Sequence, residues 1–299
     1  MRSARGPLLA MGAAPMPGPR ETGVLSGHMA RTERELATVV RDVDVVWEVA
    51  DARCPRASRN PRLARLCGER PRVLVLTHAD RAEEEATRRW VAHLEREVVT
   101  VAVSLHGMPW GGRGLLEAAT ARALASTSRP PRAGGYRAVV AGVPNSGKST
   151  LLNHVLGERR AHVGARAGVT RGRQWFGLPG GGHLLDLPGV LAPRLGSWPA
   201  SWRLWTVEAL PPGAVDDEAA GAELAAWIAQ RAPRNLEGRF GIDESRPGPE
   251  LLAGIAQARG LLGPGGAPRP AAAAQVLRSE LRQGLLGCVT LEEPPAPSQ

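Results

Sequence analysis

The chain has 299 residues, of which 38 are Lys or Arg and 29 are Asp or Glu, giving a formal net charge of +9. A chain of this length suggests about two domains with buried cores, and its charge favours a polyanionic partner such as nucleic acid or anionic lipid, although an arginine-rich proteome bias with a solvated surface explains it equally well. The sequence contains no run of about 18 apolar residues, so it does not predict a membrane-spanning helix. The three widely separated cysteines argue against a disulfide scaffold or a cysteine metal site.

Residues 1–26 form a leader ahead of the first recognisable element. Three arginines precede the first acidic residue, Glu21, in a stretch rich in Pro and Gly. An Arg-bearing, acid-free start resembles an organelle transit peptide. A disordered leader, or a start codon assigned too early, would give the same pattern.

Helices and strands alternate from residue 28 to residue 126. The pattern predicts helices at 28–43, 83–97 and 114–126, and strands at 43–50, 73–76 and 98–103. This alternation is typical of an α/β fold, a mostly parallel sheet with helices on both faces. Ligands of such sheets gather at the carboxyl ends of the strands, which here carry Asp51, Asp80 and Ser104.

Residues 142–149 fit the phosphate-binding pattern G-x-x-x-x-G-K-[ST], between a strand at 137–141 and a helix beginning at Lys148. The backbone N–H groups of such a loop converge on phosphates. Lys148 would neutralise the β- and γ-phosphates, and the Ser149 hydroxyl would ligate Mg²⁺. The predicted nucleotide-binding residues here are Asn145, Ser146, Gly147, Lys148, Ser149 and Thr150.

Lys148 is the one lysine in the chain, and the other 37 basic residues are arginines. The broad guanidinium of Arg cannot enter a tight phosphate-binding loop as a slim ammonium can. The single lysine therefore stands where the chemistry requires one.

Downstream, a predicted hairpin at 174–178 and 183–185 leads into Asp186-Leu187-Pro188-Gly189, which fits the D-x-x-G of a second switch. Asp186 would hold Mg²⁺ through water, and the Gly189 N–H would sense the γ-phosphate. Thr170, in a Gly-flanked loop between the two phosphate elements, suits the first switch as a second protein ligand of Mg²⁺. A lone Thr in a loop is more often only a loop residue, and its place between these elements favours the ligand role.

The guanine-reading element N-K-x-D normally follows the phosphate loop, but nothing beyond residue 190 fits it. Upstream, the strand 73–76 runs into a loop ending at Asp80, and the strand ending at Ser104 fits the second base-contacting loop. The motif order is therefore circularly permuted. A compact α/β domain tolerates this, because it can be reopened at a surface loop without changing its contacts. Beyond residue 195 the pattern predicts a small helical domain, with helices at 218–231, 251–262 and 271–284.

With these motifs the chain resembles the circularly permuted ribosome-assembly GTPases, a family that includes mitochondrial ribosome-associated GTPases and bacterial large-subunit assembly GTPases. The resemblance covers residues 27–292 and is carried by residues 27–30, 51–53, 58–61, 142–149, 186–194, 270–273 and 282–287. It implies a GTPase domain at 27–196, a helical domain at 197–292 that docks on ribosomal RNA, and a tail at 293–299.

The same resemblance implies hydrolysis of GTP to GDP, with Mg²⁺ and K⁺, coupled to maturation of the large ribosomal subunit and to regulation of translation. It implies the matrix side of the mitochondrial inner membrane as the location, with peripheral membrane association; the bacterial cytoplasm is the alternative. A monomer is the default expectation.

Two departures from the family pattern fall in the guanine reader. Thr77 and His78 replace the usual Asn and Lys, whereas Asp80, which would accept two N–H bonds from guanine, is kept. Loss of the Asn should remove a base contact and a tie to the phosphate loop, at about 1–3 kcal/mol for each polar group left unpaired. His78 could stack its ring under the base. In the second base loop, Ser104-Leu105 replaces the usual Ser-Ala.

Hydrolysis needs a group that orients the attacking water, and Val190 stands where Ras-like GTPases have a Gln. The resemblance implies two substitutes: Asn145 as a ligand of K⁺ near the β- and γ-phosphates, and His28 as the water-orienting residue. A single His before a helix is more often a cap or a packing residue.

Six arginines are candidates for RNA phosphate contacts, and for each a solvated surface role is equally open: Arg53, Arg56, Arg59, Arg62, Arg278 and Arg282. A non-hydrolysing RNA-binding checkpoint protein that binds nucleotide weakly is the main rival hypothesis. A small-molecule kinase is a weaker one, because Thr170 and Asp186 argue against it.

Overall fold

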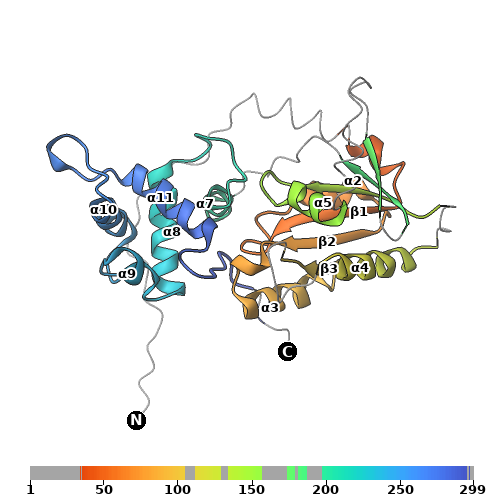
Figure 1. The fold of residues 1–299 in the computed structure, drawn as a ribbon, viewed down its shortest axis with the longest axis horizontal. Helices are drawn as coiled ribbons and strands as arrows, with labels where there is room; N and C mark the ends of the chain where they lie inside the picture. The colour runs from red at the N-terminus through yellow and green to blue at the C-terminus, as the bar shows by residue number, and fades with distance from the viewer. Residues whose placement is uncertain are drawn as a thin grey trace, which may run out of the picture.

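The computed structural model describes residues 34, 36–104, 112–128, 134–156, 174–178, 181–186, 197–294 and 296. The described residues form two parts that lie side by side, a sheet region within 34–186 and a helical region within 197–287 (Figure 1). None of the helices in these ranges combines the length and the apolar character that crossing a bilayer would require.

The sheet region is built on one six-stranded sheet with the order β3-β2-β1-β4-β6-β5. Every neighbouring pair is parallel except β5 and β6, which form an antiparallel hairpin. The predicted mostly parallel α/β fold is therefore confirmed. The strands are β1 (Val45–Asp51), β2 (Arg72–Thr77), β3 (Val99–Ala102), β4 (Arg137–Gly142), β5 (Gln174–Gly177) and β6 (His183–Asp186).

Strand β1 lies at the centre of the sheet and is buried along its whole length. Its alternate residues Val45, Trp47 and Val49 pack under helices α4 (Arg113–Ala125) and α5 (Lys148–Leu156). Val46 faces the other side, where it packs with Val40 and with helix α2 (Pro61–Cys67). This period of two places a helix layer on each face of the sheet, as predicted.

On the same side as α2, helix α3 (Glu84–Leu94) covers β2 through Trp90 and Leu94. A short 3₁₀ turn, η1 (Ala79–Arg81), connects β2 to α3. The strand register aligns Asp51 with Thr77 and Val49 with Gly142. The carboxyl ends of β2, β1 and β4 therefore meet at one edge of the sheet.

The helical region consists of α7 (Trp198–Thr206), α8 (Asp217–Arg231), α9 (Asn235–Phe240), α10 (Gly248–Ala258), the 3₁₀ turn η2 (Pro264–Gly266) and α11 (Pro270–Gln283). Its core is mainly aliphatic and includes Leu224, Ile228, Leu252 and Leu277. The sequence analysis predicted α8, α10 and α11, but extended the second to residue 262. Helix α10 ends earlier, because Gly260 adopts the left-handed conformation that terminates helices.

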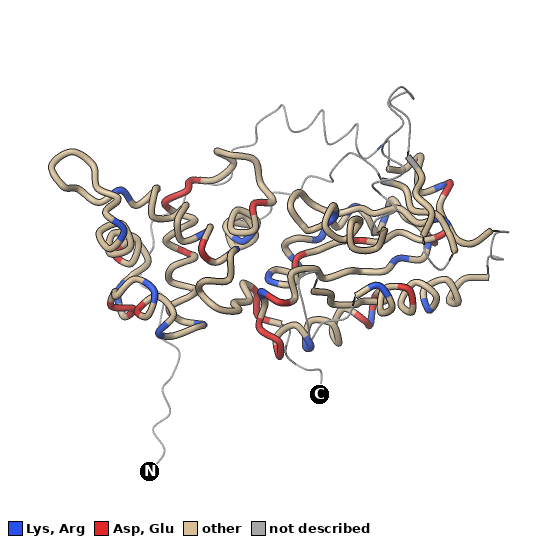
Figure 2. The backbone as a smooth tube through the Cα atoms, viewed as in Figure 1, with Lys and Arg blue, Asp and Glu red and all other residues tan. Residues whose placement is uncertain are grey.

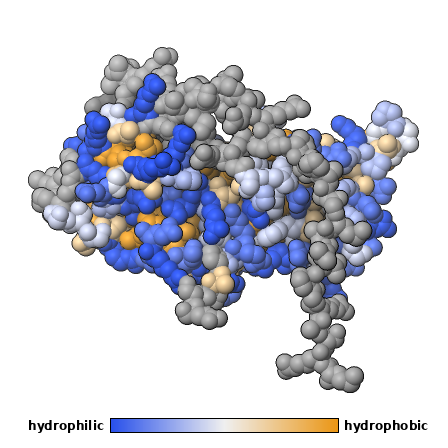
Figure 3. All heavy atoms as spheres, turned by 180° about the vertical axis from the view of Figure 1, so that it is seen from behind, coloured by the Kyte–Doolittle hydropathy of each residue, from blue (hydrophilic) through white to orange (hydrophobic). Residues whose placement is uncertain are grey.

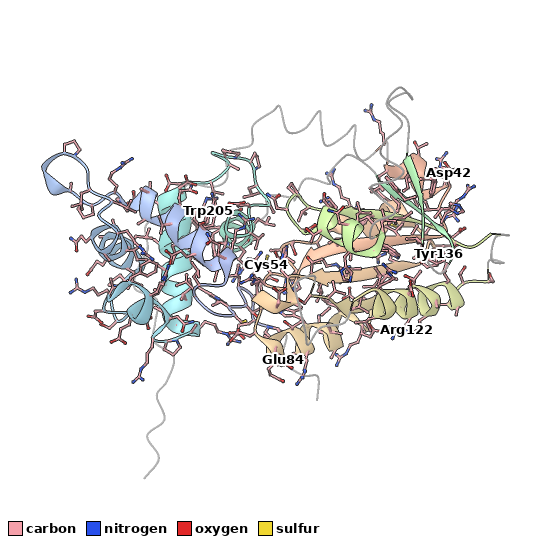
Figure 4. The ribbon with its side chains drawn as sticks, in the orientation of Figure 1. Asp42, Cys54, Glu84, Arg122, Tyr136 and Trp205 are labelled. Carbon is pink, nitrogen blue, oxygen red and sulfur yellow. The ribbon has the colours of Figure 1, made fainter. Side chains whose placement is uncertain are left out.

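A segment of residues 288–294, here called the strap, leaves the helical region and binds the sheet region. Its Val289 N–H donates to the Arg81 carbonyl (3.1 Å), and its Leu291 N–H donates to the Arg53 carbonyl (2.6 Å). The Glu292 carboxylate accepts the backbone N–H groups of Arg56 (2.7 Å) and Ala57 (2.9 Å). Cys54, labelled at the boundary in Figure 4, belongs to the same apolar core as the helical region. The two parts are thus joined by backbone hydrogen bonds and by shared core.

Candidate nucleotide site

The phosphate loop connects β4 to α5 in a conformation that depends on glycine. Gly147 has a φ of +82°, and a β-carbon on Gly142 would lie 2.3 Å from the Val49 carbonyl oxygen. Lys148 Nζ curls back to donate to the Val143 carbonyl (2.5 Å). Ser149 is the second residue of α5 and is exposed. The loop thus has the close backbone approach and the ammonium that a phosphate group requires.

The guanine-reader loop touches the phosphate loop directly. Thr77 Oγ1 lies 2.6 Å from the Ser146 carbonyl and 3.1 Å from the Ala50 carbonyl. Because a hydroxyl has one hydrogen, it donates to the closer Ser146. The expectation that losing the usual Asn also removes the tie to the phosphate loop is therefore wrong: the Thr77 hydroxyl is short enough to reach that backbone and makes the tie itself.

His78 occupies the left-handed conformation, with a φ of +56°. Its Nε2 lies 3.3 Å from the place a β-carbon of Gly147 would take, so the imidazole lies over the phosphate loop. Burial is the largest influence on this ring and lowers its pKa, against the opposing attraction of Asp51. His78 is therefore neutral near pH 7, unlike the lysine that the family pattern has here.

One carboxylate oxygen of Asp80 has no hydrogen-bond donor among the described residues. Its Oδ2 pairs with Arg81 Nε at 3.2 Å, whereas its Oδ1 is buried and accepts no hydrogen bond from the part of the chain that the structure describes. Leaving a buried carboxylate oxygen unpaired is costly. This oxygen fits a ligand with N–H donors, as the guanine edge has.

Asp51 and Arg53 form a buried bidentate pair beside this loop, with Arg53 Nε 2.9 Å from Oδ1 and Nη2 2.7 Å from Oδ2. Burial by itself would raise the pKa of the Asp51 carboxyl, but the Arg53 guanidinium outweighs it and holds the pKa below its ordinary value. The pair organises the turn before α2, because the backbone N–H of Arg53 also donates to Asp51.

Several arginines proposed as RNA contacts form ion pairs with carboxylates of the protein itself. Arg53 is 97% buried as a side chain, and Arg59 pairs with buried Glu48 at 2.9 Å. Arg278 and Arg282 both face Glu208. The RNA role is wrong for Arg53, because its side chain is buried. For Arg59, Arg278 and Arg282, which are partly exposed and paired with carboxylates, and for the exposed Arg56 and Arg62, it stays a prediction.

Some predicted site residues lie outside the described residues: His28, Leu105, Thr170 and Gly189. For Asp186 only the backbone position, at the end of β6, is described. Ser104 is buried just after β3 at the same sheet edge, and Thr150 lies in the first turn of α5. The structure therefore brings Thr77 and His78 into contact with the phosphate loop, and Asp80 lies in the 3₁₀ turn that follows them.

Two contacts of this site were not foreseen from the sequence. Arg81 pairs with Asp80, and its neighbouring position was the signal that could have revealed it. Asn145 Nδ2 donates to the backbone carbonyl of Glu208 at 2.8 Å. A backbone carbonyl 63 residues away has no sequence signature, so nothing in the motif could have indicated this contact.

Comparison with known proteins gives consistent matches. A family model described as "50S ribosome-binding GTPase" matches residues 137–211. "Ribosome biogenesis GTPase A" of Bacillus cereus is 32% identical over 90% of this chain and 92% of its own length. "Mitochondrial ribosome-associated GTPase 1" of Bos taurus is 32% identical over 57% of this chain and 54% of its own length.

Among solved structures, GNP-bound YlqF from T. maritima superposes with a TM-score of 0.63 at 27% identity, covering 88% of this chain and 98% of that one. A GDP-bound structure of the same protein gives a TM-score of 0.62. The likeness therefore extends over both the sheet region and the helical region.

Proposed function

The chain belongs to the ribosome biogenesis GTPase A family and is a GTPase of ribosome assembly, and we propose that it acts on the large ribosomal subunit, docking in its GTP form and leaving after hydrolysis. The fold is the circularly permuted P-loop GTPase fold of this family. The name of the matching family model, which refers to the 50S ribosome, supports the large subunit as the target.

One observation carries the assignment of guanine nucleotide to this site. The loop that ends at Asp80 is encoded before the phosphate loop, yet Thr77 donates to Ser146 within that loop. Asp80, three residues after Thr77, adds a buried Oδ1 that has no hydrogen-bond partner among the described residues. A base held by Asp80 and phosphates held by Lys148 can therefore belong to one molecule of nucleotide.

The residues divide the work of hydrolysis as follows. Lys148 would bind the β- and γ-phosphates, and Ser149, Thr170 and Asp186 would hold Mg²⁺, which would supply charge neutralisation at the reacting phosphate. The Gly189 N–H would sense the γ-phosphate. His28 would orient the attacking water in place of the glutamine that Val190 replaces, and Asn145 would bind K⁺ beside the phosphates. On the base side, Ser104 and Leu105 would supply the second contact.

The charge of the chain indicates which part meets ribosomal RNA. Residues 1–196 contain 29 Lys and Arg against 17 Asp and Glu, whereas residues 197–299 contain 9 against 12. Both signs are interspersed along the described helical region (Figure 2). RNA phosphates are bound mainly by positive charge. We therefore place the main electrostatic contact on the GTPase part, and assign the helical region at 197–292 a docking role through shape.

Two compartments fit this function. The bovine mitochondrial relative and the Arg-bearing residues 1–20 support the mitochondrial matrix, beside the inner membrane. The Bacillus cereus relative aligns with more of the chain and supports a bacterial cytoplasm. A fusion of residues 1–26 to a fluorescent protein distinguishes the two, because import into mitochondria requires a working targeting sequence.

Nucleotide binding and turnover test the function directly. Labelled GTP should bind more tightly than ATP or XTP, and large-subunit precursors should accelerate hydrolysis, more in K⁺ than in Na⁺. Small-subunit particles are the matched control. Binding without turnover under any of these conditions would support a non-hydrolysing checkpoint protein instead.

A further inference from the structure

The side chain of Asn145 is fixed by the helical region. Its Nδ2 donates to the Glu208 backbone carbonyl at 2.8 Å. Because a carbonyl only accepts, the amide nitrogen must face Glu208, and Oδ1 is left to accept a hydrogen bond or to bind a cation. Both residues have a positive φ, +54° for Asn145 and +57° for Glu208. Non-glycine residues keep such conformations only where their surroundings hold them.

Glu208 is in turn held by helix α11. It follows the end of α7, where its N–H donates to the Trp205 carbonyl at 3.0 Å. Its carboxylate pairs with Arg282 and lies 3.7 Å from Arg278 Nη2. The Arg278 guanidinium also lies 4.7 Å from the centroid of the Trp205 ring, labelled on α7 in Figure 4.

The same end of α11 reaches the base side of the site. Arg81, the partner of Asp80, donates through Nη1 to the Gln283 carbonyl at 2.5 Å. Gly284 caps the helix there in the left-handed conformation, and a β-carbon on it would meet the Arg81 guanidinium. One helix end therefore contacts the phosphate side through Glu208 and the base side through Arg81.

We propose that Glu208 is a positioning residue for GTP hydrolysis: it orients Asn145 toward the phosphates and makes that orientation depend on helix α11. This inference rests on the proposed function. The backbone carbonyl of Glu208 sets the direction of the Asn145 amide, and the carboxylate, fixed by Arg278 and Arg282, sets the position of the carbonyl. A partner that displaces α11 would change the hydrolysis rate through this connection.

A double-mutant cycle tests the connection in the full-length protein. Glu208→Gln removes the charge that Arg282 binds, and Asn145→Ala removes the amide. We expect Glu208→Gln to lower kcat for GTP by on the order of tenfold, as misplacing a reacting group does, with Kd for GTP unchanged. In the Asn145→Ala background the same substitution should have no further effect on kcat, because the group it positions is absent.

Two further variants separate positioning from folding. Arg282→Lys keeps the charge and should restore most of the kcat that Arg282→Gln loses. Arg239→Gln is the matched control, since Arg239 forms an ion pair with Glu280 of the same helix at 2.6 Å without reaching the phosphate loop. Its thermal midpoint should fall about as far as that of Arg282→Gln, with kcat kept.

These experiments distinguish failure of the positioning role from failure of the proposed function. Wild-type protein that does not hydrolyse GTP would refute that function. Wild-type protein that hydrolyses GTP, combined with additive effects of Glu208→Gln and Asn145→Ala on kcat, would overturn only the positioning role. An unchanged kcat in Glu208→Gln would overturn it as well.

Discussion

The carboxylate of Asp80 has one oxygen paired with Arg81 and another, Oδ1, that is buried without a donor among the described side chains. Both features prepare it for a base that offers adjacent N–H groups. Arg81 fixes the position of the carboxylate through Oδ2, and Oδ1 is left to accept hydrogen bonds from a ligand. We therefore propose that the base preference of the protein depends on this side chain.

Substituting Asp80→Asn should exchange the preferred base. Two charge-assisted hydrogen bonds to guanine, each worth about 1.5–3 kcal/mol, would be weakened, so GTP affinity should fall by about 100-fold or more. XTP affinity should rise, because an amide can donate to the 2-oxo group of xanthine. Competition binding against labelled GTP measures both changes. Glu84→Gln, on the exposed start of α3, is the control and should leave both affinities unchanged.

Because His78 is buried, we expect the free energy of unfolding of the protein to decrease in mild acid. Burial lowers its folded-state pKa below the ordinary 6.5, with Asp51 and Asp80 opposing the shift and Arg53 and Arg282 adding to it. As pH falls from 6.5 toward the folded pKa, the unfolded chain binds more protons, so the free energy of unfolding decreases. Urea unfolding of wild type and His78→Gln at about pH 7.5 and about pH 5.5 measures this. An equal decrease in both proteins would contradict it.

At the residue level the positions of the phosphate loop, between β4 and α5, and of Asp80, just after β2, were predictable, because these motifs are local and their spacing is rigid. The roles of Arg53 and Arg59 were not, since a count of arginines does not show which carboxylates face them. Glu48, the partner of Arg59, lies 11 residues away in the central strand and is buried there. The Asn145 contact was beyond prediction, because its acceptor is a backbone atom of another region.

At the level of elements, glycines decide how closely the helices approach. A β-carbon on Gly221 of α8 would lie 2.3 Å from the Ala274 β-carbon of α11. A β-carbon on Gly238 of α9 would have nothing within 4 Å. The first glycine is therefore required by packing, whereas the second is only a residue of low helix propensity.

Gly221→Ala and Gly238→Ala should change stability in opposite directions. The first forces α8 and α11 apart and should lower the free energy of unfolding by about 1–3 kcal/mol. The second removes backbone freedom from the unfolded chain at an open helical site, and should raise it by about 0.5–1 kcal/mol. Urea unfolding followed by circular dichroism measures the pair. A loss of stability in Gly238→Ala would show that α9 has less room than it has in this structure.

The predicted strands and long helices were found where period and length were clear. Helix α2 was missed in the sheet region, and helices α7 and α9 were missed in the helical region. Helix α7 begins Trp198-Pro199 and is rich in tryptophan, and α9 has six residues with a glycine inside it. Propensity is weak in both, and burial of Trp202, Leu236 and Phe240 against the aliphatic core stabilises them instead.

At the scale of the whole molecule, the strap fastens the two parts. Val289 and Leu291 are buried, and their backbone groups bond to the sheet region. Trp227 of α8 donates to the Thr290 carbonyl at 2.9 Å, so the strap is bound from the helical side as well. Pairings across 200 residues cannot be inferred from local patterns, which is why the sequence did not predict this segment.

Removing residues 288–299 should uncouple the two parts. The deletion removes several hydrogen bonds, each worth about 0.5–1.5 kcal/mol, together with the buried side chains of Val289 and Leu291. We expect the thermal unfolding curve to separate into two transitions, with faster proteolysis between the parts. Removing residues 295–299 is the control, because it leaves every strap contact named here. A single transition at the wild-type midpoint in the longer deletion would refute the prediction.

Seen from behind, the described surface is mainly hydrophilic, with small apolar patches on the side of the sheet (Figure 3). Arginine supplies nearly all of the positive charge of the chain, and Lys148 supplies the one side-chain amine. An acylating reagent that modifies primary amines therefore has a single side-chain target, whose Nζ lies against the Val143 carbonyl. Mass spectrometry of that one peptide would report occupancy of the phosphate loop directly, even inside a ribosomal particle crowded with other amines.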